Sequence, residues 1–274
     1  MKKTIRKNGK KTYFLSLIFF VFIFLNTFFC LQKSVQAEVK TIHILVALCD
    51  NHYQGIVPVP HSLGNGQNPD NNLYWGAAYG IKTFFKKQHD WQFLTTIKNI
   101  SPEILERVIF HHKQYDVYLV ADAYDGRFIR KSIDDLFLFA AGYNKQTLTF
   151  NNQIFSIAGG AQYLVYVGHN GLMDFKVESV AQKMGDSGSR SVAAFACMSQ
   201  QYFSLPLRDA GVKTGFFTTQ FMAPEAYSVH TLIDGWLKQE SPNTIHKRVA
   251  KIYSQYQKLK SPALKLFSTK FSDE

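Results

Sequence analysis

Two short apolar runs constrain the fold of this chain more than any other feature. The first covers residues 163–167 and is followed by His169, and the second covers residues 191–196 and ends at Cys197. Both runs are rich in strand-forming residues and bounded by Gly or Ser, which is typical of buried strands in a parallel sheet. Because the carboxyl ends of parallel strands meet at one edge, we expect His169 and Cys197 to lie together there.

Predicted strands and helices alternate along the rest of the chain. The predicted strands are residues 41–48, 91–97, 116–121, 163–167, 191–196 and 212–218, with a hairpin at 147–150 and 153–157. The predicted helices are residues 73–88, 101–113, 132–141, 177–184, 224–238 and 242–258. This alternation predicts an α/β fold with a mainly parallel sheet. We expect one domain over residues 38–274, with a basic and loosely held tail after about residue 261.

The helix at residues 101–113 is predicted from its first residues. A capping serine, a proline in the first turn and an acid stand in order at Ser101, Pro102 and Glu103. His111 and His112 close this segment, but adjacent helical residues diverge by about 100° and cannot both face one metal ion. We therefore assign no metal site to them.

Other polar residues have structural interpretations. Residues 53–72 form a long Gly- and Pro-rich loop, which predicts a functional or mobile segment, but its glycines do not match a phosphate-binding loop. His43, inside the first strand, is expected to be a hydrogen-bonded core histidine. Asp122 and Asp125 follow a strand, where carboxylates either act as an acid/base pair or cation site or cap the next helix.

The N-terminus reads as an export signal. Six Lys and Arg residues precede an apolar block at residues 14–31, and small residues occupy Val35 and Ala37. We interpret residues 1–37 as a cleaved signal peptide, which makes the domain periplasmic or secreted, with no stable membrane span after cleavage. The alternative is an uncleaved N-terminal anchor, because the block approaches the about 18 residues that begin to span a bilayer. Cys30 lacks the preceding small residues of a lipoprotein signal.

The net charge depends on that signal. The whole chain carries +11, but residues 1–37 hold seven of its 31 Lys and Arg residues and none of its 20 acids. Removal leaves 24 basic residues against 20 acidic ones, a net charge of +4. The basic composition is thus no ground for a nucleic-acid partner.

Two cysteines remain after processing, Cys49 and Cys197. In an oxidising compartment they can form a disulfide, which is the alternative to a reactive thiol at Cys197.

The two blocks also resemble a known signature. Tyr163-Leu-Val-Tyr-Val-Gly-His169-Asn-Gly171 and Val192-Ala-Ala-Phe-Ala-Cys197 are similar to the paired strands of the caspase-like cysteine peptidases, which include caspases, legumains, gingipains, clostripain and separases. The order of predicted elements from residue 41 to about 240 is similar too. The resemblance implies a caspase-like three-layer α/β/α sandwich and an exported endopeptidase that acts on polypeptides without a metal or an organic cofactor.

The resemblance also implies roles for individual residues. Cys197 would attack the scissile carbonyl as a thiolate, with His169 as the general acid/base. The N–H groups of Cys197 and Gly171 would stabilise the oxyanion. Asn51, or alternatively Asp50, would orient the histidine.

The chain departs from the family pattern at two positions. Asn170 stands between His169 and Gly171, where members of the group usually have glycine directly after the histidine. Phe195 occupies the position two before the cysteine, where several members have a polar or acidic residue, so we assign no first-pocket specificity.

The disulfide alternative depends on the order of the strands. In the caspase-like order the histidine strand lies between the first strand and the cysteine strand. Two strand spacings are about 9–10 Å, beyond the ~7 Å between Cα atoms that a disulfide can bridge. That order would separate Cys49 from Cys197.

Two other functions fit the same residues. The chain could be a catalytically inactive caspase-like binding or scaffolding module of the cell envelope, or a Cys–His hydrolase or acyl transferase acting on a non-peptide substrate. The sequence leaves the substrate and the oligomeric state open.

Overall fold

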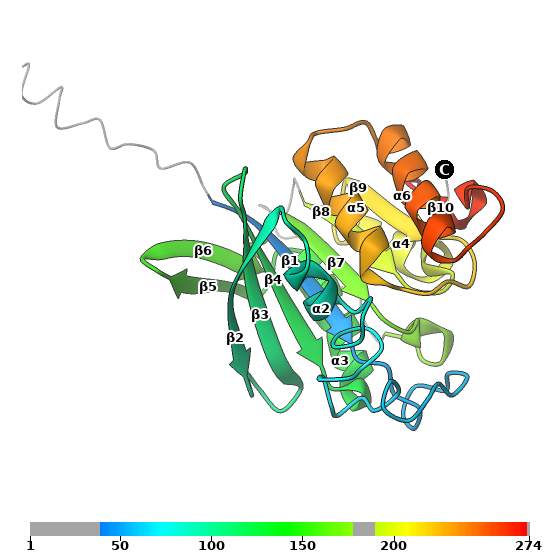
Figure 1. The fold of residues 1–274 in the computed structure, drawn as a ribbon, viewed down its shortest axis with the longest axis horizontal. Coiled ribbons are helices and arrows are strands. Elements are labelled where there is room, and N and C mark those ends of the chain that lie inside the picture. Colours follow the sequence, from blue (N-terminus) through cyan, green and yellow to red (C-terminus); the bar gives the residue numbers. More distant parts are fainter. Residues whose placement is uncertain (1–38, 178–189, 273–274) are drawn as a thin grey trace, which may run out of the picture. The chain divides into compact units, whose positions relative to one another are not determined.

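An eight-stranded sheet forms the centre of the computed structural model, which describes residues 39–177 and 190–272 (Figure 1). The strand order is β10-β9-β8-β7-β1-β4-β3-β2. The strands are β1 (Lys40–Ala47), β2 (Trp91–Lys98), β3 (Ile104–His112), β4 (Val117–Tyr124), β7 (Tyr163–Val167), β8 (Ser191–Phe195), β9 (Thr214–Thr218) and β10 (Phe267–Ser268). Strands β4, β1, β7, β8 and β9 run parallel, whereas β2, β3 and β10 pair antiparallel. The predicted α/β class with a mainly parallel sheet is confirmed.

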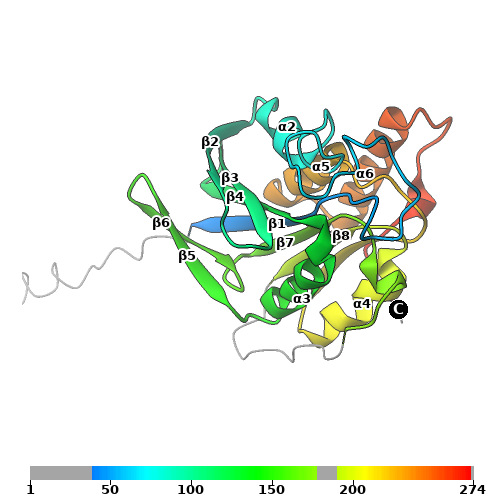
Figure 2. The ribbon, with the colours of Figure 1, turned by 90° about the horizontal axis from the view of Figure 1, so that it is seen from below.

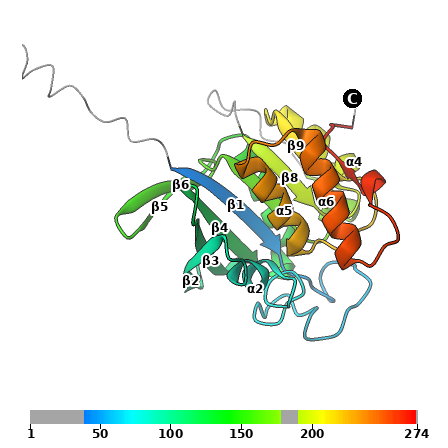
Figure 3. The same cartoon turned by 45° about the horizontal axis from the view of Figure 1, so that its top comes forward.

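Helices cover both faces of the sheet, as Figure 2 shows. They are α2 (Ile81–Lys86), α3 (Ile129–Ala140), α4 (Ser199–Asp209), α5 (Ala226–Leu237) and α6 (Pro242–Tyr256). Residues of β1 alternate between the two layers: Ile42 and Ile44 pack with α2, α5 and α6, while Leu45 and Ala47 pack with α3 and α4. Figure 3 shows α5 and α6 side by side along β8 and β9. This arrangement is the expected three-layer α/β/α sandwich.

A separate hairpin, β5 (Lys145–Phe150) and β6 (Gln153–Ala158), lies where the sequence predicts it. Its turn is formed by Asn151 and Asn152, both with positive φ. Asparagine tolerates this left-handed region better than most residues, which explains why the pair marks a turn.

The predicted helix at residues 101–113 is wrong, because this segment forms strand β3. Ser101 does accept a hydrogen bond from the Ile104 N–H, at 3.1 Å, but it caps a turn and not a helix. The apolar residues that follow, Val108, Ile109 and Phe110, are buried between β2 and β4. Pairing on both sides within a sheet outweighs a helix-start signal.

Three further expectations about the elements change. The helix predicted at residues 73–88 is limited to α2, and turns precede it. Helix α4 was not expected from the sequence. All of the predicted helix at 177–184 except Val177 lies outside the described residues.

The C-terminal tail is not loosely held. Strand β10 pairs with β9, so that Phe267 stands opposite Thr218. Leu266, Phe267 and Phe271 are all buried. The tail therefore belongs to the core of the domain.

A buried cluster of charges joins three strands. Asp122, within β4, accepts hydrogen bonds from Arg107 of β3 at 2.6 and 2.7 Å and pairs with His43 Nε2 of β1 at 3.0 Å. Burial acts to raise the pKa of Asp122, but the hydrogen bonds from Arg107 and His43 prevail and lower it. Asp125 instead caps a short 3₁₀ turn by accepting from the Arg127 N–H. His43 is thus the hydrogen-bonded core histidine that the sequence predicts, and Asp122 and Asp125 have separate structural roles.

The interpretation of residues 1–37 as a signal or an anchor concerns a segment outside the described residues, and so does Cys30. Within residues 39–177 and 190–272, every helix is too short or too polar to span a membrane.

Candidate active site

His169 and Cys197 follow two neighbouring parallel strands. Strand β7 pairs with β8 over its whole length, with Val167 opposite Phe195, and each reactive residue comes two positions later. Strand β7 lies between β1 and β8, which is the order that separates Cys49 from Cys197. Both cysteines are free, so the disulfide alternative is wrong.

Cys197 stands at a sharp turn between β8 and α4. Met198 has φ 52° and ψ 33°, in the left-handed region, and α4 begins at Ser199. A non-glycine residue in this region costs roughly 1–2 kcal/mol, and such backbone strain clusters at functional sites. The turn places Cys197 two residues before the amino end of α4.

The sulfur of Cys197 also contacts the backbone after β9. The Met222 N–H donates to Sγ at 3.4 Å, and the thiol donates to the Met222 carbonyl oxygen at 3.6 Å. These two contacts tie the sulfur of Cys197 to the segment that follows β9.

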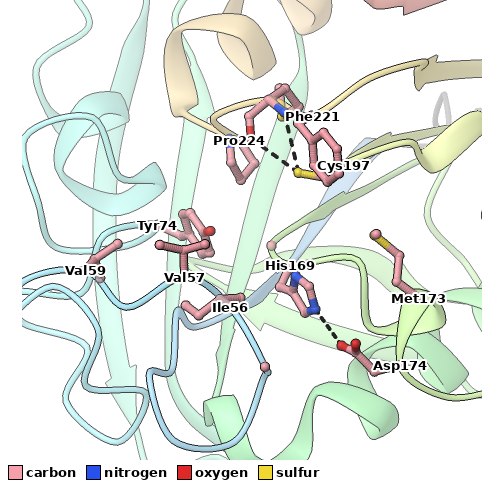
Figure 4. Close-up of a pocket in the computed structure, with 13 residues that line it drawn as sticks. Ile56, Val57, Val59, Tyr74, His169, Met173, Asp174, Cys197, Phe221 and Pro224 are labelled. Carbon is pink, nitrogen blue, oxygen red and sulfur yellow. Dashed lines mark hydrogen bonds and ion pairs between the residues drawn. The ribbon is translucent and has the colours of Figure 1, made fainter.

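Asp174 positions the imidazole of His169. Its Oδ2 lies 2.7 Å from His169 Nε2, and the carboxylate is half exposed while the ring is 14% exposed (Figure 4). Asp174 follows the short turn Gly171–Met173. Sequence reasoning missed this residue, because no local pattern shows that the turn brings it back to the histidine.

Asn170 joins the histidine turn to the cysteine turn. Its amide Nδ2 donates to the Cys197 carbonyl oxygen at 2.7 Å, and its Oδ1 accepts from the Leu172 N–H at 3.1 Å. The side chain is fully buried. The residue that departs from the family pattern therefore holds the two halves of the site together.

The two N–H groups predicted for the oxyanion differ in availability. The Gly171 N–H donates to the His169 carbonyl oxygen at 3.1 Å, so in this conformation it is not free to bind an oxyanion. The Cys197 N–H makes no hydrogen bond with another residue in the described part of the chain. Of the expected pair, only the donor from Cys197 remains.

Asn51 and Asp50 organise the loop after β1. Asn51 exchanges hydrogen bonds with the Val59 backbone, at 2.8 and 3.0 Å. Asp50 is fully buried and accepts from the His52 N–H at 2.8 Å and from Gln67 Nε2 at 2.6 Å. None of these bonds reaches His169, so Asp174 takes the orienting position expected of Asn51 or Asp50.

His169 and Cys197 line one cavity of about 330 Å³ (Figure 4). Its other walls come from the loop after β1, the turn after β7 and the segment after β9. The remaining lining residues are Gly55, Ile56, Val57, Val59, Tyr74, Gly168, Met173, Asp174, Phe221, Met222 and Pro224. The long loop that the sequence marks as functional or mobile thus forms a wall of the candidate site.

Cys49 differs sharply from Cys197. It is fully buried at the end of β1, and both its backbone groups bond to the Asn72 side chain, at 3.0 and 2.8 Å. Burial raises the pKa of the Cys49 thiol to about 11, and burial also raises that of the adjacent Tyr74 well above its ordinary value. Both groups are therefore protonated and neutral near pH 7.

Metal ligands are not grouped in the described residues: no three His, Cys, Asp or Glu side chains there could hold one ion. His111 and His112, adjacent on strand β3, point to opposite faces of the sheet.

Comparison with family models, with curated proteins and with solved structures gives no match.

Proposed function

We propose that this chain is an exported cysteine peptidase in which Cys197 is the nucleophile and His169 the general acid/base. One observation carries the proposal: His169 and Cys197 follow the carboxyl ends of the adjacent parallel strands β7 and β8, and both line one cavity. The caspase-like strand order and the free thiols add support.

The chemistry follows from these positions. His169 takes the proton of Cys197, whose sulfur bonds to the scissile carbonyl carbon, and the Cys197 N–H donates to the developing oxyanion. His169 then protonates the leaving amine as the C–N bond breaks, and a water activated by His169 hydrolyses the thioester. With Nε2 held by Asp174, Nδ1 is the nitrogen left to exchange these protons.

Thiol alkylation of the full chain combined with a peptidase assay tests the proposal. Iodoacetamide at pH 7.5 is expected to modify Cys197 and abolish peptide hydrolysis. It should spare Cys49, because a buried thiol with a pKa of about 11 is almost wholly protonated there. Peptide mapping by mass spectrometry locates the modification.

The matched variants are Cys197→Ala and Cys49→Ala. The first is expected to lower kcat by about 10³-fold or more, as losses of nucleophiles do, and the second to retain hydrolysis in its folded fraction. Undiminished hydrolysis by Cys197→Ala would rule out the proposal.

A second candidate is a binding module without hydrolysis. It is favoured by the sulfur of Cys197, whose hydrogen bonds go to the Met222 backbone and not to His169. Alkylation of Cys197 without hydrolysis of any peptide in a random library would support this candidate over the peptidase.

A further inference from the structure

The cavity beside Cys197 is apolar where a substrate side chain would enter. Three of its walls present aliphatic, aromatic or thioether groups, supplied by Ile56, Val57, Val59, Met173, Phe221 and Met222. Among the described residues that line it there is no Lys or Arg, and Asp174 is the one carboxylate. A buried charge without a partner is costly, so an acidic substrate residue has no place here.

The rim of the cavity is unusually exposed. Val57 is 88% exposed and Phe221 71%, the two highest values among the large apolar side chains of the described residues. Met173, on the third side, is 38% exposed. Apolar side chains gathered around one opening mark a binding site, because a ligand that covers them removes apolar surface from water.

Asp174 does not make the cavity a site for basic residues. Its Oδ2 pairs with His169 Nε2 at 2.7 Å, and a substrate Lys or Arg bound to the other oxygen would draw the carboxylate away from the imidazole that it positions. Tyr74, a further lining residue, is a neutral phenol at pH 7, and burial, which raises its pKa well above its ordinary value, keeps it neutral at higher pH. Both groups favour an uncharged side chain.

We infer that the cavity selects a large apolar residue (Leu, Met or Phe) at the position whose carbonyl Cys197 attacks, with Val57 and Phe221 as the specificity-determining side chains. The inference rests on the proposed peptidase function. It assigns the first pocket from the residues that line the cavity, and Phe195 is not among them. The ring of Phe195 is buried near Phe216 and Phe267, in the apolar layer on the α5 and α6 side of the sheet.

The test uses tetrapeptide aminomethylcoumarin substrates and matching acyloxymethyl ketones that differ only in the residue before the reactive carbonyl: Leu, Phe, Met, Asp, Asn or Arg. With the full chain, kcat/KM for Leu, Phe or Met is expected to exceed that for the other three by about tenfold or more. The ketones should follow the same order in their rate of labelling Cys197.

Charge variants at the rim sharpen the test. Val57→Lys should raise the relative rate for Asp and Val57→Asp that for Arg, without harm to folding, because Val57 is almost fully exposed. The matched controls are Ile154→Lys and Ile154→Asp, at a 65% exposed apolar residue on β6 that does not line the cavity. They should leave the order of substrates unchanged.

Two results would overturn the inference, and they differ. If Asp, Asn or Arg substrates react as fast as Leu, the cavity does not select apolar residues, although the peptidase proposal stands. If iodoacetamide labels Cys197 but no peptide is cleaved and no peptidyl ketone reacts, the peptidase proposal fails and the inference fails with it.

Discussion

Single residues around Cys197 divide into the two proposed to react, Cys197 and His169, and those that hold these two in place. Asn170 connects the backbone of Cys197 to the turn after His169, and Asp174 holds the histidine ring. Neither would contact the scissile bond. Their effect on catalysis would be exerted through the positions of Cys197 and His169, where small displacements are costly in rate.

Asp174→Asn is expected to lower kcat about tenfold or more while KM stays nearly constant, because the amide holds the imidazole less firmly and cannot stabilise its charged form. If the chain is the proposed peptidase, steady-state kinetics on a Leu-containing peptide measure kcat and KM separately. Asp174→Glu should restore part of kcat.

The matched control is Asp116→Asn, which changes an exposed aspartate that pairs with His111 at 3.5 Å, away from the cavity. Its kcat should equal that of the unmodified chain. An Asp174→Asn variant with unchanged kcat would show that His169 needs no carboxylate.

The sequence predicts the positions of His169 and Cys197 better than those of the residues that hold them. His169 and Cys197 are visible because each follows an apolar run that must be a strand. Asp174 depends on the path of a three-residue turn, and Asn170 on a contact across two strand ends. Such contacts have no local pattern, whereas strand ends do.

At the scale of elements, the failures have physical causes. Strand β3 begins after Ser-Pro-Glu, a local helix signal, but its buried residues pair on both sides with β2 and β4. Helix α4 contains Pro206 and several polar residues, and both features hide its helical pattern. Its position after Cys197 is set by the sheet.

The charge cluster between β1, β3 and β4 predicts how stability depends on pH. The lowered pKa of Asp122 means that its contribution is present above about pH 4, its ordinary pKa, and is lost as pH falls through the lower folded value. Arg107→Met should cost about 3–5 kcal/mol at pH 7, because it leaves a buried carboxylate without its main partner.

In the Arg107→Met variant burial would raise the pKa of Asp122, so the carboxylate would take up a proton as pH falls from 7 toward 4. The difference in the free energy of unfolding between the variant and the unmodified chain should therefore narrow over this range. Urea unfolding followed by circular dichroism at several pH values measures both trends. Lys238→Met is the matched control: its side chain is 48% exposed, its partner Asp234 keeps Arg248, and its loss should change stability far less. A deficit for Arg107→Met that is constant with pH would contradict this account.

For the whole molecule, the alternation of predicted strands and helices along the sequence is enough to predict a parallel sheet between two helical layers. This alternation does not predict the C-terminal tail. Strand β10 has two residues, too few for a pattern, yet it covers β9 at the edge of the sheet. Its burial depends on Phe195 and Phe216, which lie near Phe267.

Phe267→Ala should lower the free energy of unfolding by about 3–5 kcal/mol, because it opens a cavity in this aromatic cluster. Leu264→Ala, at a 45% exposed residue three positions earlier, should change it by less than about 0.5 kcal/mol. Thermal and urea denaturation of the two variants compare them. Equal stabilities would mean that the tail is dispensable to the core.

Two walls of the cavity belong to connecting segments, residues 55–59 and 221–224, and neither contributes a strand. The turn after β7, which carries His169 and Asp174, forms the third wall. The side chains of the two connecting segments can therefore change while the strands of the sheet stay the same. Substitution of the side chains of Ile56, Val57 and Phe221 would alter the lining of the cavity. The backbone bonds of Met222 to the sulfur of Cys197 would be inherited unchanged. These two segments are the place to randomise in a library that seeks new selectivities from this protein.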